Sequence, residues 1–183
     1  DIFNKQGYVG TSLSDLTRAT NLTKGGIYGN FENKNDVAIT VYEYNIRRLL
    51  GNLEDQLRYK KTAFDKFSIY LNYYENHVDT ILQMGGCPLL NTGTDVDDTH
   101  PDLKLHVQNN LQQWKLHLIE TLKLGIEEKE IKSDVVVDEF VDVFIATIEG
   151  GLFLAKMSDE KKRFLHSINF LRKQVLAILT IKP

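Results

Sequence analysis

Residues 23–26 combine a hydroxyl, a positive charge and two glycines at a point where a helix is expected to begin. Thr23 supplies the hydroxyl and Lys24 the charge, at the helix end where backbone amides and the helix dipole favour phosphate. Gly25 and Gly26 have no Cβ, so the backbone can come close to a ligand. This combination predicts binding to the phosphate backbone of a nucleic acid.

The residues that follow extend the pattern. Tyr28 lies one turn into the expected helix, where its hydroxyl could donate to a phosphate, and Lys34 could hold a flanking phosphate by its charge. Ile27 and Phe31 are four residues apart, so we expect them to face inward and hold the helix on its neighbours.

Short, tightly connected helices are needed to present these side chains. Capping residues predict three: residues 12–20 after Thr11 or Ser12, residues 23–31 after Thr23, and a longer helix from about residue 34 after Asn33. The first two have the proportions of a helix-turn-helix, because only about three residues connect them. Leu22, within that connection, is expected to be buried beneath the corner.

The chain opens with residues that read as the end of an earlier helix closing at Gly7. Its first residue is Asp1, so we expect at least a turn or two of helix to precede it in the natural protein.

The chain has 183 residues, of which 42% are hydrophobic and 26% charged. This composition is typical of a globular protein and excludes chains that are disordered throughout or collagen-like. No apolar run approaches the roughly 18 residues that a membrane span needs. The single cysteine, Cys87, allows no internal disulfide, which fits a reducing compartment. We therefore expect a cytoplasmic protein without a membrane partner.

The net charge of −3 hides a division along the chain. Residues 1–48 carry six basic and five acidic side chains, whereas the remainder carries 16 basic and 20 acidic ones. A slightly positive head on an acidic body suits a protein that contacts DNA at one end only.

Beyond residue 50, apolar residues recur at helical spacing and predict four longer helices, over residues 62–84, 101–130, 134–156 and 159–180. The last two are apolar on more than one face, which favours burial from two directions and hence a homodimer. A central helix inside a larger core would show the same pattern. The expected dimer interface consists of apolar residues of these two helices: Phe140, Phe144, Ile148, Phe164, Ile168, Leu171 and Val175.

Aromatic residues of the expected helices 62–84 and 101–130 could line an apolar pocket. Tyr70, Trp114 and His117 are our candidates for contact with a small molecule, although most aromatic residues on helices belong to the core.

Cys87 lies beside Pro88 at an expected helix break, where a thiol near a helix start could sense oxidants. A small buried packing residue is the competing interpretation. The acidic stretch from Asp95 to Asp102, which includes His100, lacks the spacing of a metal site and reads as a solvated loop. No Ser-His-Asp arrangement, P-loop, dinucleotide fingerprint or HExxH pattern occurs, so we expect no enzyme, cofactor or metal.

A regular order of residue types runs through the first part of the chain: Phe3, Gly7, Tyr8, Thr11, Ser12, Asp15, Leu16, Leu22, Thr23, Lys24, Gly25, Ile27, Tyr28, Phe31, Lys34 and Val37. In spacing and residue type it resembles the DNA-binding domain of TetR-family transcriptional regulators, over residues 2–48. The stretch 146–152 is similar to part of the family's penultimate helix. The resemblance implies an all-α protein with a three-helix helix-turn-helix domain at residues 1–48 and a helical ligand-binding and dimerisation domain at residues 49–183.

The resemblance also implies DNA contacts along this segment, at Thr11, Ser12, Thr23, Lys24, Gly25, Gly26, Tyr28, Asn30 and Lys34. In the family, positions corresponding to 26, 29 and 30 read bases. This chain departs from the family there, because Gly26, Gly29 and Asn30 replace larger polar or aromatic residues. Each glycine also weakens a helix by roughly 1 kcal/mol relative to Ala.

The expected function is therefore a ligand-responsive regulator, most often a repressor in this family, whose homodimer binds a palindromic operator and is released by a small molecule. The alternative is a helical small-molecule-binding or oxidant-sensing protein, acting through Cys87, with weakened or lost DNA binding. The missing side chains at positions 26 and 29 would favour that alternative.

Overall fold

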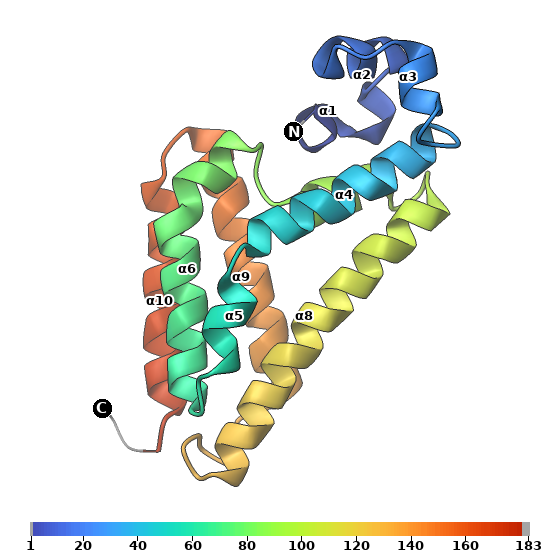
Figure 1. The fold of residues 1–183 in the computed structure, drawn as a ribbon. Coiled ribbons are helices and arrows are strands. Elements are labelled where there is room, and N and C mark those ends of the chain that lie inside the picture. Colours follow the sequence, from blue (N-terminus) through green and yellow to red (C-terminus); the bar gives the residue numbers. More distant parts are fainter. Residues whose placement is uncertain (1, 181–183) are drawn as a thin grey trace. The chain divides into compact units, whose positions relative to one another are not determined.

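The structure is a computed structural model in which residues 2–180 are described (Figure 1). Within these residues the chain forms ten helices, and an isolated bridge joins Ile131 to Leu179. The helices are α1 (Ile2–Gly10), α2 (Leu13–Thr20), α3 (Lys24–Tyr28), α4 (Lys34–Leu50), α5 (Leu53–Arg58), α6 (Ala63–Gln83), α7 (Pro88–Val96), α8 (Pro101–Glu127), α9 (Val137–Ser158) and α10 (Lys162–Ile178). The expected all-α fold is confirmed. Asp1, on which the expectation of a preceding helix rests, lies outside the described residues.

Two compact units divide the described chain. The first contains the residues up to Leu49 together with Gln83–Leu111, and the second contains Leu50–Leu82 together with the residues from Gln112 onward. The first unit thus includes a segment that sequence reasoning grouped with the later helices. Across residues 2–180, none of the helices combines the length and apolar character that a bilayer crossing requires.

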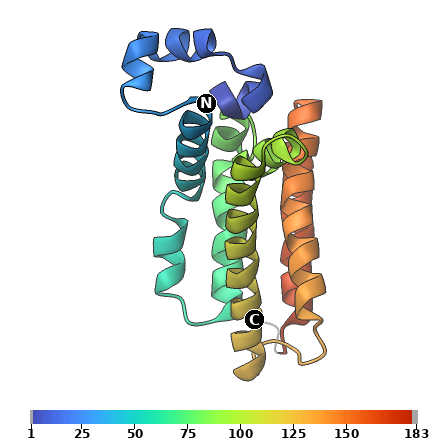
Figure 2. The ribbon, with the colours of Figure 1, turned by 90° about the vertical axis from the view of Figure 1, so that its right-hand side faces the viewer.

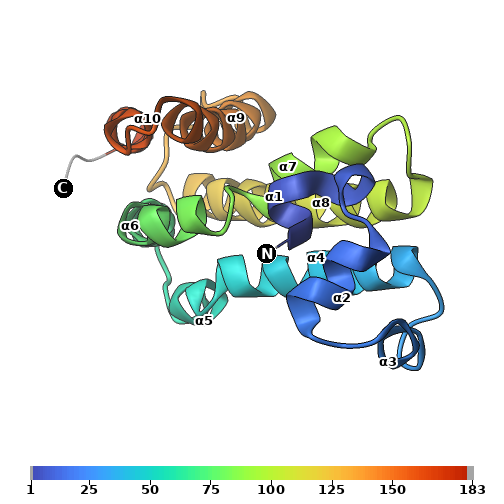
Figure 3. The same cartoon turned by 90° about the horizontal axis from the view of Figure 1, so that it is seen from above.

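In the first unit, α1, α2 and α3 gather around a small apolar core at one end of α4 (Figure 3). Its buried residues are Leu16 of α2, Ile27 of α3 and Val37 of α4. Partly buried apolar side chains complete it: Ile2, Phe3, Leu13, Tyr28, Phe31 and Val41. Ile27 and Phe31 face this core, as their spacing predicts. Burial of large apolar side chains contributes roughly 1.5–3 kcal/mol each, which is what holds such short helices in place.

In the second unit, α6, α9 and α10 run alongside one another (Figures 1 and 2). Their facing sides are aromatic. Phe67 of α6 meets Phe144 of α9 edge-on, with 5.4 Å between ring centroids, and Tyr74 of α6 meets Phe164 of α10 at 6.4 Å. These rings form the core of the second unit.

The predicted dimer interface is wrong in its residues. Six of the seven side chains are at most 3% exposed within the single chain, so they cannot face a partner: Phe144, Ile148, Phe164, Ile168, Leu171 and Val175. Only Phe140 is partly exposed. The sequence showed apolar residues on more than one face of each helix, but it did not show which face the chain itself covers.

Three local predictions also differ from the structure. Leu22 is 49% exposed, because the chain turns at Asn21 without folding Leu22 under the corner. The helix expected over residues 23–31 ends at Tyr28. The acidic stretch is not a loop throughout: Pro88 begins α7, which continues to Val96 and so includes Asp95. Helices α5 and α7 were not predicted, because both are short and lie between turn-forming residues.

Candidate nucleic-acid interface

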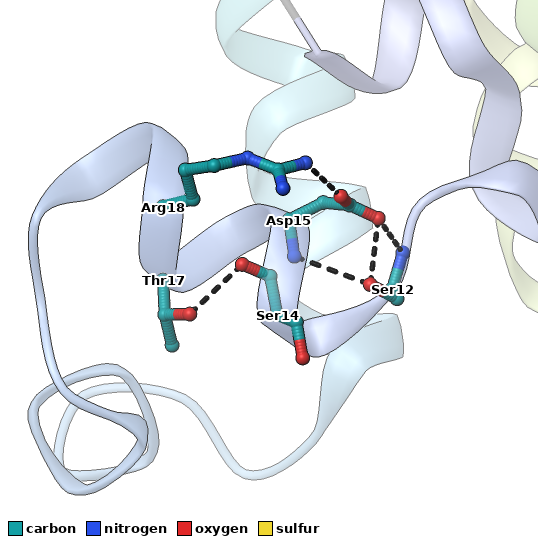
Figure 4. A network of polar contacts seen from close by, with 5 residues as sticks. All are labelled: Ser12, Ser14, Asp15, Thr17 and Arg18. Carbon is teal, nitrogen blue, oxygen red and sulfur yellow. Dashed lines mark hydrogen bonds and ion pairs between the residues drawn. The ribbon is translucent and has the colours of Figure 1, made fainter.

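The start of α2 is held by a reciprocal pair of hydrogen bonds (Figure 4). The Ser12 Oγ accepts from the Asp15 backbone N–H at 3.2 Å, and an Asp15 carboxylate oxygen accepts from the Ser12 backbone N–H at 2.9 Å. Arg18, one turn later, pairs with the other Asp15 oxygen. The hydrogen bonds from Ser12, and then the charge of Arg18, lower the pKa of Asp15. The carboxylate therefore stays ionised and keeps α2 capped at neutral pH.

A left-handed residue makes the turn into α3. Asn21 has φ 56°, a conformation that Asn tolerates better than most residues. Thr23 then caps α3, since its Oγ1 accepts from the Gly26 N–H at 3.0 Å. At the other end, Asn30 Nδ2 donates to the Gly26 carbonyl at 3.1 Å. Asn30 thus closes a helix that spans only residues 24–28.

The outer surface of this helix pair carries the predicted contact residues. Thr23, Lys24, Gly25 and Asn30 are exposed. The Thr23 hydroxyl uses one acceptor position for capping, so its proton is available to a phosphate oxygen. Asn30 retains its carbonyl oxygen and a second N–H for a base edge. This surface can bind nucleic-acid phosphates through Lys24 and Thr23.

Tyr28 and Lys34 are less exposed than their predicted roles suggest. Tyr28 is half-buried against the apolar core of the first unit. The Lys34 Nζ donates to the Tyr8 carbonyl at 2.6 Å and lies 4.2 Å from the centre of the Tyr8 ring. An ammonium has three N–H donors, so this contact leaves two for a phosphate. Lys34 therefore holds α1 against α4, whatever else it contacts.

Thr11 and Ser12, just ahead of α2, were both predicted to contact DNA. For Thr11 this prediction is wrong. Its side chain is fully buried and donates to the Gly7 carbonyl at 2.6 Å. Ser12 is exposed, but its hydroxyl donates to Asp15 at 2.6 Å as well as accepting from it. A polar residue before a helix is equally typical of a helix cap and of a DNA contact. Here the hydroxyls of Thr11 and Ser12 both make hydrogen bonds within the fold.

Arg18 is a candidate contact that sequence reasoning missed. Its side chain on α2 is 77% exposed, and its guanidinium pairs with Asp15 through one nitrogen, Nη2. The signal was available, since Arg18 follows Asp15 by three residues on an expected helix and so lies on the same face.

Two of the three predicted ligand contacts, Tyr70 and His117, meet in the second unit, and the third, Trp114, contacts a neighbouring tyrosine. The rings of Tyr70 and His117 meet edge-on at 6.0 Å, and Trp114 stacks on Tyr74 at 6.2 Å. Burial raises the pKa of Tyr70, and burial, with a smaller contribution from Lys66, lowers the pKa of His117. Both groups are therefore neutral at physiological pH. An aromatic cluster with two neutral polar groups can hold an apolar ligand, and this role remains a prediction.

Cys87 is only 3% exposed, at the residue before α7 begins. A thiol that solvent does not reach offers no site for an oxidant, so the structure favours the packing interpretation. Within residues 2–180, no group of three or more His, Cys, Asp or Glu side chains is arranged to hold a metal ion.

The outer side of α9 and α10 is open and apolar. A groove of about 300 Å³ between them is lined by residues that include Val136, Phe140, Val143 and Phe170. Other apolar side chains of the two helices are also exposed: Phe153 (52%), Leu154 (55%), Met157 (59%) and Leu176 (38%). A soluble domain rarely exposes so many large apolar side chains on adjacent helices unless they bind a partner.

Comparison with known proteins identifies both parts of the chain. Residues 1–41 match the family model of bacterial regulatory proteins of the tetR family, and residues 63–171 match the tetracyclin repressor-like C-terminal domain. A TetR-family transcriptional regulator from Cytophaga hutchinsonii has a similar structure, with a TM-score of 0.89 and 35% identity over 99% of this chain and 90% of that one.

Two further relatives agree. A TetR transcriptional regulator from Chloroflexus aurantiacus has a TM-score of 0.89 and 30% identity, covering 97% of this chain and 90% of its own. The negative transcriptional regulator IcaR of the biofilm operon in Staphylococcus epidermidis is 21% identical over 98% of this chain and 92% of its own length. With its capped helix pair and exposed Thr23 and Lys24, the chain belongs to the TetR family and is a DNA-binding transcriptional regulator.

Proposed function

We propose that this chain is a repressor whose homodimer binds a palindromic operator through α2 and α3 and releases it when a small molecule occupies the second unit. The exposed start of α3 carries the proposal, because Thr23 and Lys24 stand clear of the core that holds the helix. The negative transcriptional regulator IcaR, similar over nearly its whole length, supports repression.

Operator contacts of this head are mainly with phosphates. Lys24 and Arg18 are its exposed cations on α3 and α2, and Thr23 adds a hydroxyl. Direct reading of bases falls to Asn30, because positions 26 and 29 carry no side chain. We therefore expect the affinity of this protein for DNA to depend strongly on salt. We also expect it to discriminate between DNA sequences less than a typical member of the family.

The second copy packs on the outer side of α9 and α10. The exposed apolar side chains there support this choice, with Val143 49% and Phe170 47% exposed. A two-fold pair of recognition helices must match half-sites about one helical turn of DNA apart. A ligand that changes this spacing would release the operator, and the aromatic cluster of Tyr70, Trp114 and His117 is the proposed effector site.

The test is a titration of two DNA duplexes, the region upstream of the gene and a random sequence, at about 50 and about 200 mM salt. Affinity should fall steeply with salt, and sedimentation should give two chains per bound operator. Lys24→Ala should weaken binding to both duplexes and reduce the slope of log affinity against log salt by about two, because each chain loses one phosphate contact worth about 0.9.

Lys123→Ala is the matched control, since Lys123 is an exposed lysine of the second unit. It should leave both affinity and slope unchanged. Salt-insensitive or absent binding by the unaltered protein would contradict the proposal. An unchanged slope in Lys24→Ala would remove Lys24 from the contacts.

A further inference from the structure

Helix α1 is fastened to α7 and to the turn before it by polar contacts at two places, between residues 80 to 87 positions apart in sequence. Near its start, the Asn4 Nδ2 donates to the carbonyls of Met84 at 2.8 Å and Gly86 at 3.0 Å. Asn4 is 5% exposed, so these bonds are shielded from water. In return, the Asn91 Nδ2 of α7 donates to the Asn4 carbonyl at 3.1 Å and to the Gly85 carbonyl at 2.7 Å.

The second tie lies at the bend of α1. Gly7 has φ 76°, which interrupts the helix and turns the next backbone N–H outward. That N–H, of Tyr8, donates to the Asp95 carboxylate at 2.5 Å. A Cβ at position 7 would lie 2.8 Å from an Asp95 oxygen, so only glycine allows the carboxylate this close. The residue types at positions 7 and 95 therefore depend on each other.

The bend is connected onward to both neighbouring helices of the head. The Tyr8 carbonyl accepts from Lys34 at the start of α4, and the Gly7 carbonyl accepts from the buried Thr11 just before α2. The directions of the Gly7 and Tyr8 carbonyls therefore set where α2 begins relative to α4. Because α3 shares its core with α2, this also sets the direction of Thr23 and Lys24.

We propose that Asp95 and Asn91 are positioning residues for DNA binding: without touching DNA, they hold α1 so that α2 and α3 present their contacts correctly. The inference rests on the proposed DNA-binding role. It also means that residues 83–111, which form one compact unit with the residues up to Leu49, take part in presenting α2 and α3 to DNA.

The decisive variant is Asp95→Ala. Removing an acidic residue near a DNA-binding surface ordinarily raises affinity, because it reduces repulsion of phosphates. A positioning role predicts the opposite: affinity for the upstream duplex falls about tenfold, as expected for loss of one charge-assisted hydrogen bond. The salt slope stays unchanged, since no phosphate contact is lost. Asp95→Asn, which keeps an acceptor oxygen for the Tyr8 N–H, should restore most of the affinity.

Asp98→Ala is the matched control. Asp98 is an exposed acid of the same segment, and its removal changes the charge by the same amount. It should bind DNA as well as the unaltered protein or better. If Asp95→Ala behaves like Asp98→Ala, or if its salt slope falls, the positioning role is overturned.

A readout without DNA separates this inference from the proposed function. Amide hydrogen exchange at Tyr8 should be slow in the unaltered protein and faster in Asp95→Ala, and equal exchange in the two would refute the tie. Absent DNA binding by the unaltered protein would instead defeat the proposed function. Should Asp95→Ala fail to fold, Asn91→Ala removes the other tie and carries the same expectation, lower affinity at an unchanged slope.

Discussion

Two adjacent glycines of α9, Gly150 and Gly151, should differ in how their replacement by Ala changes the free energy of unfolding. Gly151 faces α10: a Cβ there would lie 2.5 Å from Ser167 Oγ, 2.8 Å from Ser167 Cβ and 3.1 Å from a ring carbon of Phe164. The Ser167 Cβ is fixed by its own backbone, so α9 and α10 must separate. A Cβ at Gly150 would meet no atom within 4 Å.

The magnitude follows from a difference. Both residues lie inside the helix, so each replacement gains roughly 1 kcal/mol from the higher helix propensity of Ala. This gain cancels when the two variants are compared, and only the packing contact remains. Forcing an extra carbon into a filled interface typically costs about 1–3 kcal/mol. We expect Gly150→Ala to raise the free energy of unfolding by about 1 kcal/mol and Gly151→Ala to fall about 1–3 kcal/mol below it.

Thermal and urea unfolding, followed by circular dichroism, measure this difference. For a chain of this size, about 1 kcal/mol corresponds to roughly 2–4 °C in Tm. Equal stability of the two variants would refute the close contact of α9 with α10. The Gly150→Ala curve should also be recorded at several protein concentrations, because Gly150 is exposed in the single chain. If the second copy covers that face, the stability gain will vary with concentration.

Two further outcomes are expected in the DNA-binding head. Gly26→Ala should stabilise it by up to about 1 kcal/mol, because a Cβ at position 26 lies at an ordinary 3.4 Å from Thr23 Oγ1. Gly29→Ala should stabilise it less, because a Cβ at position 29 would lie 3.2 Å from the Gly25 carbonyl oxygen. Urea unfolding compares the two variants, and a larger gain at position 29 would contradict the geometry. Because the pKa of Asp15 is lowered in the folded protein, its capping stabilises the DNA-binding head fully above the ordinary Asp pKa, and this contribution is lost as pH falls through the lower folded value. The free energy of unfolding should therefore decline below about pH 4, and Asp15→Asn should make that decline shallower when unfolding is measured as a function of pH.

The helices of the DNA-binding head were largely predictable because their signals are local. A cap involves a side chain and a backbone N–H three residues away, as at Ser12 with Asp15 and at Thr23 with Gly26. The inward direction of Ile27 follows from spacing within a single helix. Such contacts form wherever the helix forms, so residue type and spacing are enough.

Exposure was not predictable in the same way. Thr11 and Ser12 are adjacent hydroxyl residues, yet one is fully buried and the other exposed. The last two helices carry apolar residues around most of their circumference, and the covered face was assigned to a partner in error. Burial depends on which other elements arrive at a face, and that information lies elsewhere in the chain.

The amino-acid sequence alone determined the helical class, the helix-turn-helix and the residues at the start of α3, because capping and periodicity act within a few residues. Only the tertiary structure decided that Asp95 meets the Tyr8 N–H at the Gly7 bend and that residues 83–111 form one compact unit with the residues up to Leu49. Contacts between residues 80 or more positions apart depend on how the chain packs, and no local pattern records that packing.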